Sequence, residues 1–340
     1  TYKPRLSLEP IIRLISLILC IHSTYRSICS LYHHYITMLS MFRKVPTIQP
    51  VLIMDSFSVK QSESIRKILT KEELPPKQKH LERIVEGTRQ RKSCSFFWSG
   101  IIFGNLEKHP IVTWKFCHIL HAMISDGHES VPAESYQSLR RLLGLRDFWK
   151  QRQSTGYGSC SAQYTSVLCD RLMFHRKYPQ IPGNLVVNES VVSSFHNVVA
   201  LNATTEILDQ LDNLLLLQRT VFDSLEWPYV TGQGQTLLAP LALVISDTWK
   251  LYELLVSLLN HLHTVYPAAR LAIHRRRFQE IFRQIKSFYD LANKLHYFPS
   301  LPEIPISPPT FEEAEEIQLA NQVEEIRLRE EPRSLLMQPD

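Results

Sequence analysis

Glycine and strand-like sequence are both scarce in this chain. Only 10 of its 340 residues are glycine, and few stretches alternate Val or Thr with polar residues. Leu and Ile instead recur at helical spacing, and hydrophobic residues make up 44% of the chain, enough to bury a sizeable core. These features exclude a disordered chain and one built mainly from sheet. The sequence therefore predicts an all-α protein.

Cysteines are also few, and they lie far apart. A chain of this length does not need disulfides to fold, and several of the cysteines fall inside helical patterns. This usage favours a reducing cytosol. The six are Cys20, Cys29, Cys94, Cys117, Cys160 and Cys169.

No apolar run in the N-terminal part is long enough to cross a membrane. Residues 11–21 (IIRLISLILCI) are apolar but contain Arg13, and they number about half of the ~20 residues that a bilayer requires. A signal-peptide core is an alternative, but no clear small-residue cleavage site follows. Met54 begins MDSFSVKQ, which is typical of a natural start. We therefore interpret residues 1–53 as a leader upstream of the folded domain.

Charge is distributed unevenly along the chain. The 38 Lys and Arg exceed the 33 Asp and Glu by only five. Positive charge gathers at 60–92 and 270–286, whereas acidic residues gather at 312–331. This pattern favours a local anionic partner over a surface that binds nucleic acid.

Helical periodicity begins near residue 56. The pattern predicts a helix to about 71, a break at Pro75-Pro76 and a second helix over 77–91. Shorter and then longer helices follow, so a short-helix solenoid continuing into a longer three-helix bundle is expected. The expected later helices fall within 96–104, 111–125, 133–145, 160–177, 191–225, 238–264 and 268–296.

The C-terminal part changes composition after His296. A proline-rich stretch, YFPSLPEIPISPPT, is typical of a linker, and an acidic, helix-forming tail follows it. We predict three parts of the chain: a leader at 1–53, a helical domain at 54–300, and a linker with an acidic tail at 301–340 that approaches a coiled coil.

The two helices around Pro75-Pro76 carry a group of basic residues. On the first, the spacing predicts that Lys60, Lys67 and Lys71 share a solvent-facing stripe, opposite Ile65, Ile68 and Leu69. On the second, Lys79 and Arg83 should lie opposite a buried face formed by Leu81, Ile84, Val85 and Thr88. His80 is expected on the flank and Lys77 in the first turn.

Cations in the first turn of a helix oppose its dipole. Stability alone favours Asp or Glu there, and each cation costs a few tenths of a kcal/mol. A phosphate reverses this preference, because the free N–H groups at the helix start and the nearby cations would all attract it. A merely solvated basic face is the alternative that these residues leave open.

Beyond these local features, Lys67 followed ten residues later by Lys77, within PKQKH, resembles the phosphoinositide-binding motif of ANTH domains. Ile68 departs from the family, which usually has alanine there. Other stretches resemble the N-terminal region of the huntingtin-interacting protein 1 family, over about 56–310. They include SFFWSG, WKFCHILHAMISDGHESV, YPQIPGNLVV and HRRRFQEIFRQIKSFYDLANKLHYF.

The resemblance implies an ENTH/ANTH-like, right-handed helical solenoid that acts as a clathrin adaptor in endocytosis. The implied ligand is phosphatidylinositol bisphosphate in the plasma membrane, bound by Lys67, Lys77, Lys79 and His80, with Lys60, Lys71 and Arg83 as auxiliary charge. His80, beside phosphates, should be partly protonated and favour binding in mild acid.

Partners and location follow from the same resemblance. The implied partners are epsin ENTH domains, clathrin light chain and F-actin, the last two through regions of the family outside these 340 residues. A coiled coil there would make the full-length protein dimeric. The implied location is cytoplasmic, at the plasma membrane and in clathrin-coated pits and vesicles. A helical protein-interaction scaffold with an incidental basic patch is the alternative.

Other reactive residues do not form a convincing site. Cys117, His118 and His121 have the wrong spacing for a metal site with His128, and they are expected to fill the interior. Cys160 is expected in a loop, STGYGSCS, without a complete nucleophile or phosphate-loop motif.

A second basic segment, 274–286, could contact RNA or a membrane. However, its Phe278, Ile281, Phe282 and Ile285 have the spacing of a buried helix face, so Arg275, Arg276 and Arg283 are interpreted as solvated charge. We therefore predict no enzyme, no cofactor, no metal site and no nucleic-acid partner.

Overall fold

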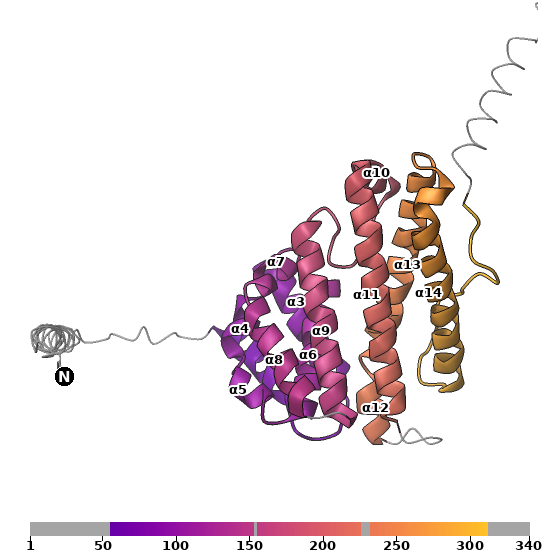
Figure 1. The fold of residues 1–340 in the computed structure, drawn as a ribbon. Helices are drawn as coiled ribbons and strands as arrows, with labels where there is room; N and C mark the ends of the chain where they lie inside the picture. The colour runs from indigo at the N-terminus through magenta and orange to yellow at the C-terminus, as the bar shows by residue number, and fades with distance from the viewer. Residues whose placement is uncertain (1–54, 153–154, 226–231, 312–340) are drawn as a thin grey trace, which may run out of the picture. The chain divides into compact units, whose positions relative to one another are not determined.

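The computed structural model describes residues 55–152, 155–225 and 232–311, and in these ranges every regular element is an α-helix (Figure 1). The predicted leader and acidic tail, with Cys20 and Cys29, lie outside the described residues. None of the helices within these ranges is long and apolar enough to cross a membrane. The predicted all-α class is confirmed.

The N-terminal half is a stack of short helices. Asp55 begins the first by accepting a 2.8 Å hydrogen bond from the Ser58 amide, a standard N-cap. The helices are α2 (Ser56–Ile68), α3 (Gln78–Arg91), α4 (Ser95–Gly100), α5 (Phe103–Leu106), α6 (Pro110–Asp126), α7 (Val131–Tyr136), α8 (Leu139–Arg152) and α9 (Gly156–Lys177). α2 packs on α3 and α4, whereas α6, α7 and α8 all pack on α9.

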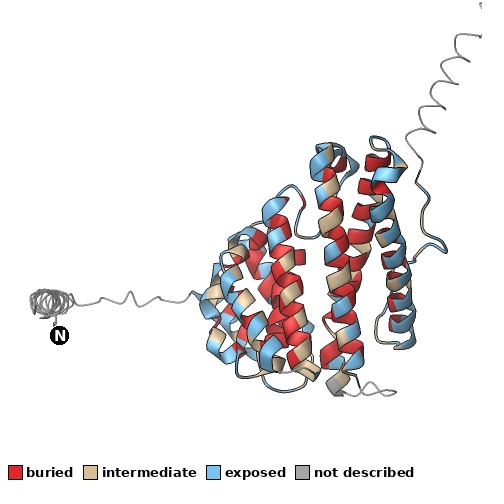
Figure 2. Ribbon diagram, in the orientation of Figure 1, coloured by how far each residue is buried: buried red, intermediate tan, exposed pale blue. Residues whose placement is uncertain are grey.

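Helix α6 is the central element of this half. Pro110 occupies its first turn, where the missing N–H is not needed, and every residue from Val112 to Ser125 is buried (Figure 2). A helix that is buried all round must be enclosed by others, and α6 packs against α3 and α9. The Trp114 indole also donates a 2.9 Å hydrogen bond to the Thr236 carbonyl, 122 residues away.

The C-terminal half contains longer helices. α11 packs against α9 on one side and against α13 and α14 on the other, so the core continues from the solenoid into the bundle (Figures 1 and 2). The expected transition to a three-helix bundle is therefore present. The helices are α10 (Glu189–Ser193), α11 (Asn197–Asp223), α12 (Gly232–Leu238), α13 (Leu241–His263) and α14 (Ala268–Lys294).

Several local predictions of secondary structure were wrong, and the helix expected over 96–104 is divided between α4 and α5. The helix expected over 191–225 is interrupted because His196 is extended and caps α11 by accepting from the Val198 amide. The helix expected over 133–145 is divided between α7 and α8. The loop expected around Cys160 is helical from Gly156, since α9 begins there and buries Cys160 against α11.

The proline-rich segment stays against the bundle. The Phe311 ring stacks on His263 with centroids 4.9 Å apart and meets Phe278 edge-on. Lys286 donates a 3.1 Å hydrogen bond to the Ile306 carbonyl. Contact with the helices thus extends at least to residue 311, and the domain boundary at 300 stays a prediction.

A buried polar cluster joins the two halves. Asp247 on α13 accepts a 2.8 Å hydrogen bond from His121 on α6 and lies 3.2 Å from the Arg171 guanidinium on α9. All three side chains are at most 3% exposed. Burial alone would raise the pKa of Asp247, but Arg171 and His121 lower it to about 2. The carboxylate is therefore ionised, and its Oδ2 contacts both Arg171 and His121.

Arg171 connects this cluster to the loop after α9. Its Nε donates to His175 Nε2 at 2.9 Å, and a second nitrogen donates to the Gly183 carbonyl at 3.0 Å. The other His175 nitrogen donates to the Ile181 carbonyl, so the imidazole is neutral, and burial lowers its pKa to about 3. Gly183 must be glycine because a Cβ there would lie 2.2 Å from the Ile124 carbonyl oxygen.

Candidate functional site

The loop between α2 and α3 is the first part of the candidate site. α2 ends at Ile68, three residues earlier than the sequence predicted. Lys115 explains the early end: its ammonium donates to the Thr70 hydroxyl at 3.0 Å and to the Thr70 and Glu72 carbonyls at 3.2 and 2.7 Å. These hydrogen bonds hold the loop against α6, so the loop does not continue α2. The predicted stripe of lysines on α2 therefore does not extend to Lys71.

This loop and the ends of the two helices enclose a hollow of about 370 Å³. The four residues singled out by the sequence motif all line it, although they come from α2, the loop and α3. Lys115 and several loop residues complete the wall. The lining residues are Lys67, Ile68, Thr70, Glu72, Leu74, Pro75, Pro76, Lys77, Lys79, His80 and Lys115.

The start of α3 faces this hollow without a capping side chain. Lys77 is the N-cap residue, just outside the first turn in which it was expected, and its side chain makes no capping hydrogen bond. The first turn also contains no acidic residue. Helix-start amides and the ammonium groups of Lys77 and Lys79 are therefore all suited to an anion.

Lys67 completes the group of exposed ammonium groups. Its only described ion pair is with Glu63, one turn earlier on α2, at 2.5 Å. Both side chains are more than 40% exposed, so the pair contributes little stability and an anion in the hollow can compete for Lys67. Glu63 is thus a weakly held counter-charge, and Glu72 is a second carboxylate that lines the hollow.

His80 is buried rather than on the helix flank as predicted. It is 6% exposed, and its Nδ1 lies 3.5 Å from the Ser64 hydroxyl of α2. Removal from water lowers the pKa of His80, and the neighbouring Lys67, Lys79, Arg83 and Lys77 lower it further. The imidazole is therefore neutral near pH 7 without a bound anion, and its protonation beside phosphates stays a prediction.

Lys115 is a site residue that the sequence did not identify. It is 2% exposed, and burial lowers its pKa. The only indication in the sequence was a single lysine within the mostly apolar helical segment WKFCHILH. Because it holds the backbone of the loop, Lys115 fixes the shape of the hollow and places positive charge at its wall.

The three auxiliary residues do not line the hollow. Lys60 is exposed on α2, and Lys71 is exposed in the loop. Arg83 is exposed on α3 and donates a 3.3 Å hydrogen bond to the Ser64 hydroxyl, which His80 also contacts. Their contribution to the site is limited to longer-range charge.

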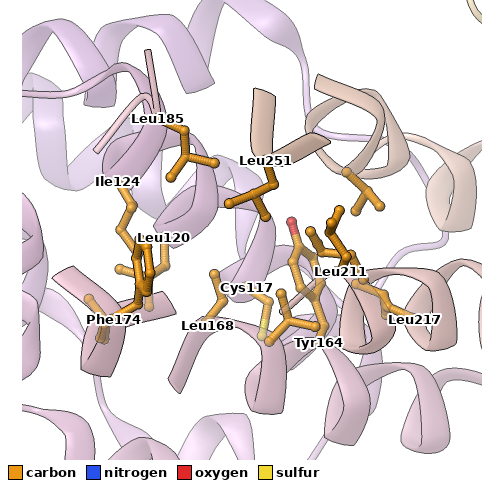
Figure 3. Packing of buried hydrophobic residues seen from close by; sticks show 14 of the residues in the cluster. Cys117, Leu120, Ile124, Tyr164, Leu168, Phe174, Leu185, Leu211, Leu217 and Leu251 are labelled. Carbon is orange, nitrogen blue, oxygen red and sulfur yellow. The ribbon is translucent and has the colours of Figure 1, made fainter. Parts of the chain in front are cut away.

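Cys117, His118 and His121 are packed in the core. Cys117 lies near Leu168 and Tyr164 (Figure 3), and burial raises its pKa to about 12. His118 is buried, which lowers its pKa to about 3. Within the described ranges, no group of three potential ligands is arranged to hold a metal ion. Their predicted interior position is confirmed.

Cys160 has a similar environment despite its helical position. Its sulfur lies 3.5 Å from the Ser224 hydroxyl and 3.6 Å from the Thr220 carbonyl. Burial raises the pKa of its thiol to about 11, so the thiolate needed for nucleophilic attack is scarce at neutral pH.

The second basic segment forms a face of α14. Phe278, Ile281, Phe282 and Ile285 are buried as predicted, whereas Arg276 and Arg283 are exposed. Arg277 is engaged with Asp209 and Asp212 of α11 at 2.8 and 2.6 Å. Arg277 therefore joins α14 to α11 through ion pairs.

Comparison with known proteins assigns this chain to a family. The family model described as ANTH domain matches residues 60–321. Huntington interacting protein related 1 of Caenorhabditis elegans is 42% identical over 253 residues, 73% of this chain and 27% of that protein. Human Huntingtin-interacting protein 1 is 35% identical over 271 residues, 76% of this chain and 26% of that protein. The chain thus spans about a quarter of the length of these relatives.

Solved structures agree in fold. The ENTH domain from epsin-2, determined in complex with phosphatidylinositol 4,5-bisphosphate, has a TM-score of 0.66 and 19% identity, covering 74% of this chain and 99% of that one. The endocytic adaptor complex AENTH has a TM-score of 0.55 and 21% identity, covering 74% of this chain and 100% of that one. Together with the family match over the helical region, these results show that the chain belongs to the ANTH domain family.

Proposed function

We propose that the chain binds phosphatidylinositol bisphosphate at the cytoplasmic face of the plasma membrane and acts as an adaptor in clathrin-mediated endocytosis. The observation that supports this most is the hollow at the α2–α3 junction, which gathers Lys67, Lys77, Lys79 and His80 around an uncapped helix start. A multiply charged phosphate group matches that arrangement of donors.

The expected affinity of one domain is modest. Each cation near an anionic leaflet contributes about 1 kcal/mol, so four to six such groups contribute roughly 4 to 6 kcal/mol before ordering costs. Dimerisation through a coiled coil elsewhere in the full-length protein would raise membrane occupancy by effective concentration.

The partners proposed for the full-length protein are epsin ENTH domains, clathrin light chain and F-actin. The relatives support an endocytic role because one of them, 24% identical over 259 residues, is Endocytosis protein end4 of Schizosaccharomyces pombe. Clathrin-coated pits and vesicles are the proposed location. The alignment with end4 covers 73% of this chain and 23% of that protein, so we assign these partners to the whole protein.

Vesicle co-sedimentation tests the proposed lipid. We expect the full chain to sediment with phosphatidylcholine vesicles that contain phosphatidylinositol 4,5-bisphosphate. It should sediment much less with vesicles whose net charge is matched by phosphatidylserine, because only the headgroup fills the hollow. Equal sedimentation with both would contradict a headgroup site. Lipid-independent capture of an endocytic partner without any vesicle binding would favour a protein-interaction scaffold instead.

The buried His80 predicts a pH dependence. A bound phosphate stabilises the imidazolium, so the pKa of His80 should be higher in the complex than in the free protein, where it is lowered. Affinity should therefore rise as pH falls through the pKa of the bound state, by roughly threefold between pH 8 and pH 6. His80→Gln should remove this rise and leave only the titration of the lipid phosphates. Identical pH profiles for both proteins, measured by vesicle titration, would contradict the role of His80.

A further inference from the structure

Leu74 is an apolar residue at a polar site. It lies in the loop between α2 and α3, its exposed fraction is 58%, and it lines the same hollow as Lys77 and Lys79. An exposed leucine is common, but here it lies beside the cations that would meet an anionic surface. Its position suits a ligand that carries apolar groups next to phosphate.

The loop holds Leu74 in place. Pro75 and Pro76 follow it directly and fix two backbone torsions. Lys115 binds the carbonyls of Thr70 and Glu72 on the preceding side. Because the loop is fixed at both ends, little conformational entropy remains to be lost when Leu74 contacts a ligand.

We propose that Leu74 inserts into the interfacial region of the bilayer when the hollow binds a phosphoinositide headgroup. This inference rests on the proposed function and names the source of the phosphate: a lipid in a membrane rather than a free inositol phosphate. A membrane surface presents phosphates with acyl chains beneath them, which is the combination that the hollow and Leu74 together fit.

Neighbouring acidic residues limit the depth of insertion. Glu72 is exposed and lines the hollow, and Glu73 is partly exposed. Moving a carboxylate past the lipid headgroups costs free energy. The Glu72 carboxylate is also attracted by the Lys115 ammonium, which keeps it at the hollow. Leu74 is therefore expected to reach the boundary between headgroups and acyl chains without entering the centre of the bilayer.

The test compares binding to a membrane with binding to the soluble headgroup. Leu74→Ala should weaken binding of the full chain to vesicles containing phosphatidylinositol 4,5-bisphosphate by about three- to tenfold, since part of one leucine side chain is no longer buried. Its affinity for inositol 1,4,5-trisphosphate should stay within about twofold of that of the unmodified chain. Leu74→Phe should restore vesicle binding, and Leu74→Glu should weaken it further.

Ile306 supplies a matched control. It is 93% exposed and, like Leu74, lies among prolines, but it does not line the hollow. Ile306→Ala should leave both affinities unchanged. Unchanged vesicle binding in Leu74→Ala, with strong loss in a Lys77→Glu/Lys79→Glu protein, would overturn insertion while the headgroup site stands. Equal loss toward vesicles and inositol trisphosphate would show that Leu74 only shapes the hollow, which also overturns insertion. Failure of the unmodified chain to bind either probe would overturn the proposed function itself.

Discussion

Reversing the charge of both Lys77 and Lys79 to Glu is expected to weaken binding to phosphatidylinositol 4,5-bisphosphate vesicles by a hundredfold to a thousandfold. Each lysine contributes about 1 kcal/mol near an anionic leaflet, and reversal replaces that attraction with a similar repulsion. The total of about 4 kcal/mol corresponds to nearly three powers of ten in affinity. Both side chains are exposed at the start of α3, so the fold should tolerate the change.

A charge-matched protein separates site effects from total charge. Lys150 lies in the last turn of α8 and Lys294 ends α14; both are exposed, and neither lines the hollow. Changing these two lysines to Glu alters the net charge by the same amount and should reduce vesicle affinity by less than about tenfold. Similar losses in the two double variants, measured by co-sedimentation, would show diffuse attraction rather than a binding site.

Replacing Arg171 with Met is expected to cost about 3 to 5 kcal/mol of the free energy of unfolding. The substitution removes one partner of a buried ion pair and leaves the Asp247 carboxylate without its strongest counter-charge. The Gly183 carbonyl and His175 would also lose their donor. Urea denaturation, followed by helical circular dichroism, measures the change.

Two further variants make this result specific. Arg283→Met removes an ion pair with Glu280 in which both side chains are at least half exposed, and it should cost less than about 1 kcal/mol. Combining Arg171→Met with Asp247→Leu removes both buried charges and should recover part of the lost stability. A loss below about 1 kcal/mol in Arg171→Met would show that the buried cluster does not stabilise the join between the two halves. Vesicle binding of the folded Arg171→Met protein should be unchanged, because Arg171 does not line the hollow.

Helical periodicity predicted much of the fold because it depends on neighbours within a few residues. Phe278, Ile281, Ile285, Phe288 and Ala292 recur at three and four and are all buried on α14. The interruptions were harder to predict. The break before α11 depends on one histidine that caps the next helix, and α9 starts at glycines that usually indicate a loop.

The candidate site was likewise predictable from the sequence only in part. Lys67, Lys77, Lys79 and His80 were found from their spacing and from resemblance to a family motif, and they line one hollow. Their role in binding lipid stays a prediction.

The sequence by itself determined which residues form helices and which faces are apolar, because these properties repeat along the chain every three to four residues. Only the tertiary structure decided that Lys115 reaches a loop about 45 residues earlier, that His80 is enclosed, and that Asp247 meets Arg171 and His121. The physical reason is that a buried polar group must find its partner wherever the packed chain places one, and no local pattern records that distance.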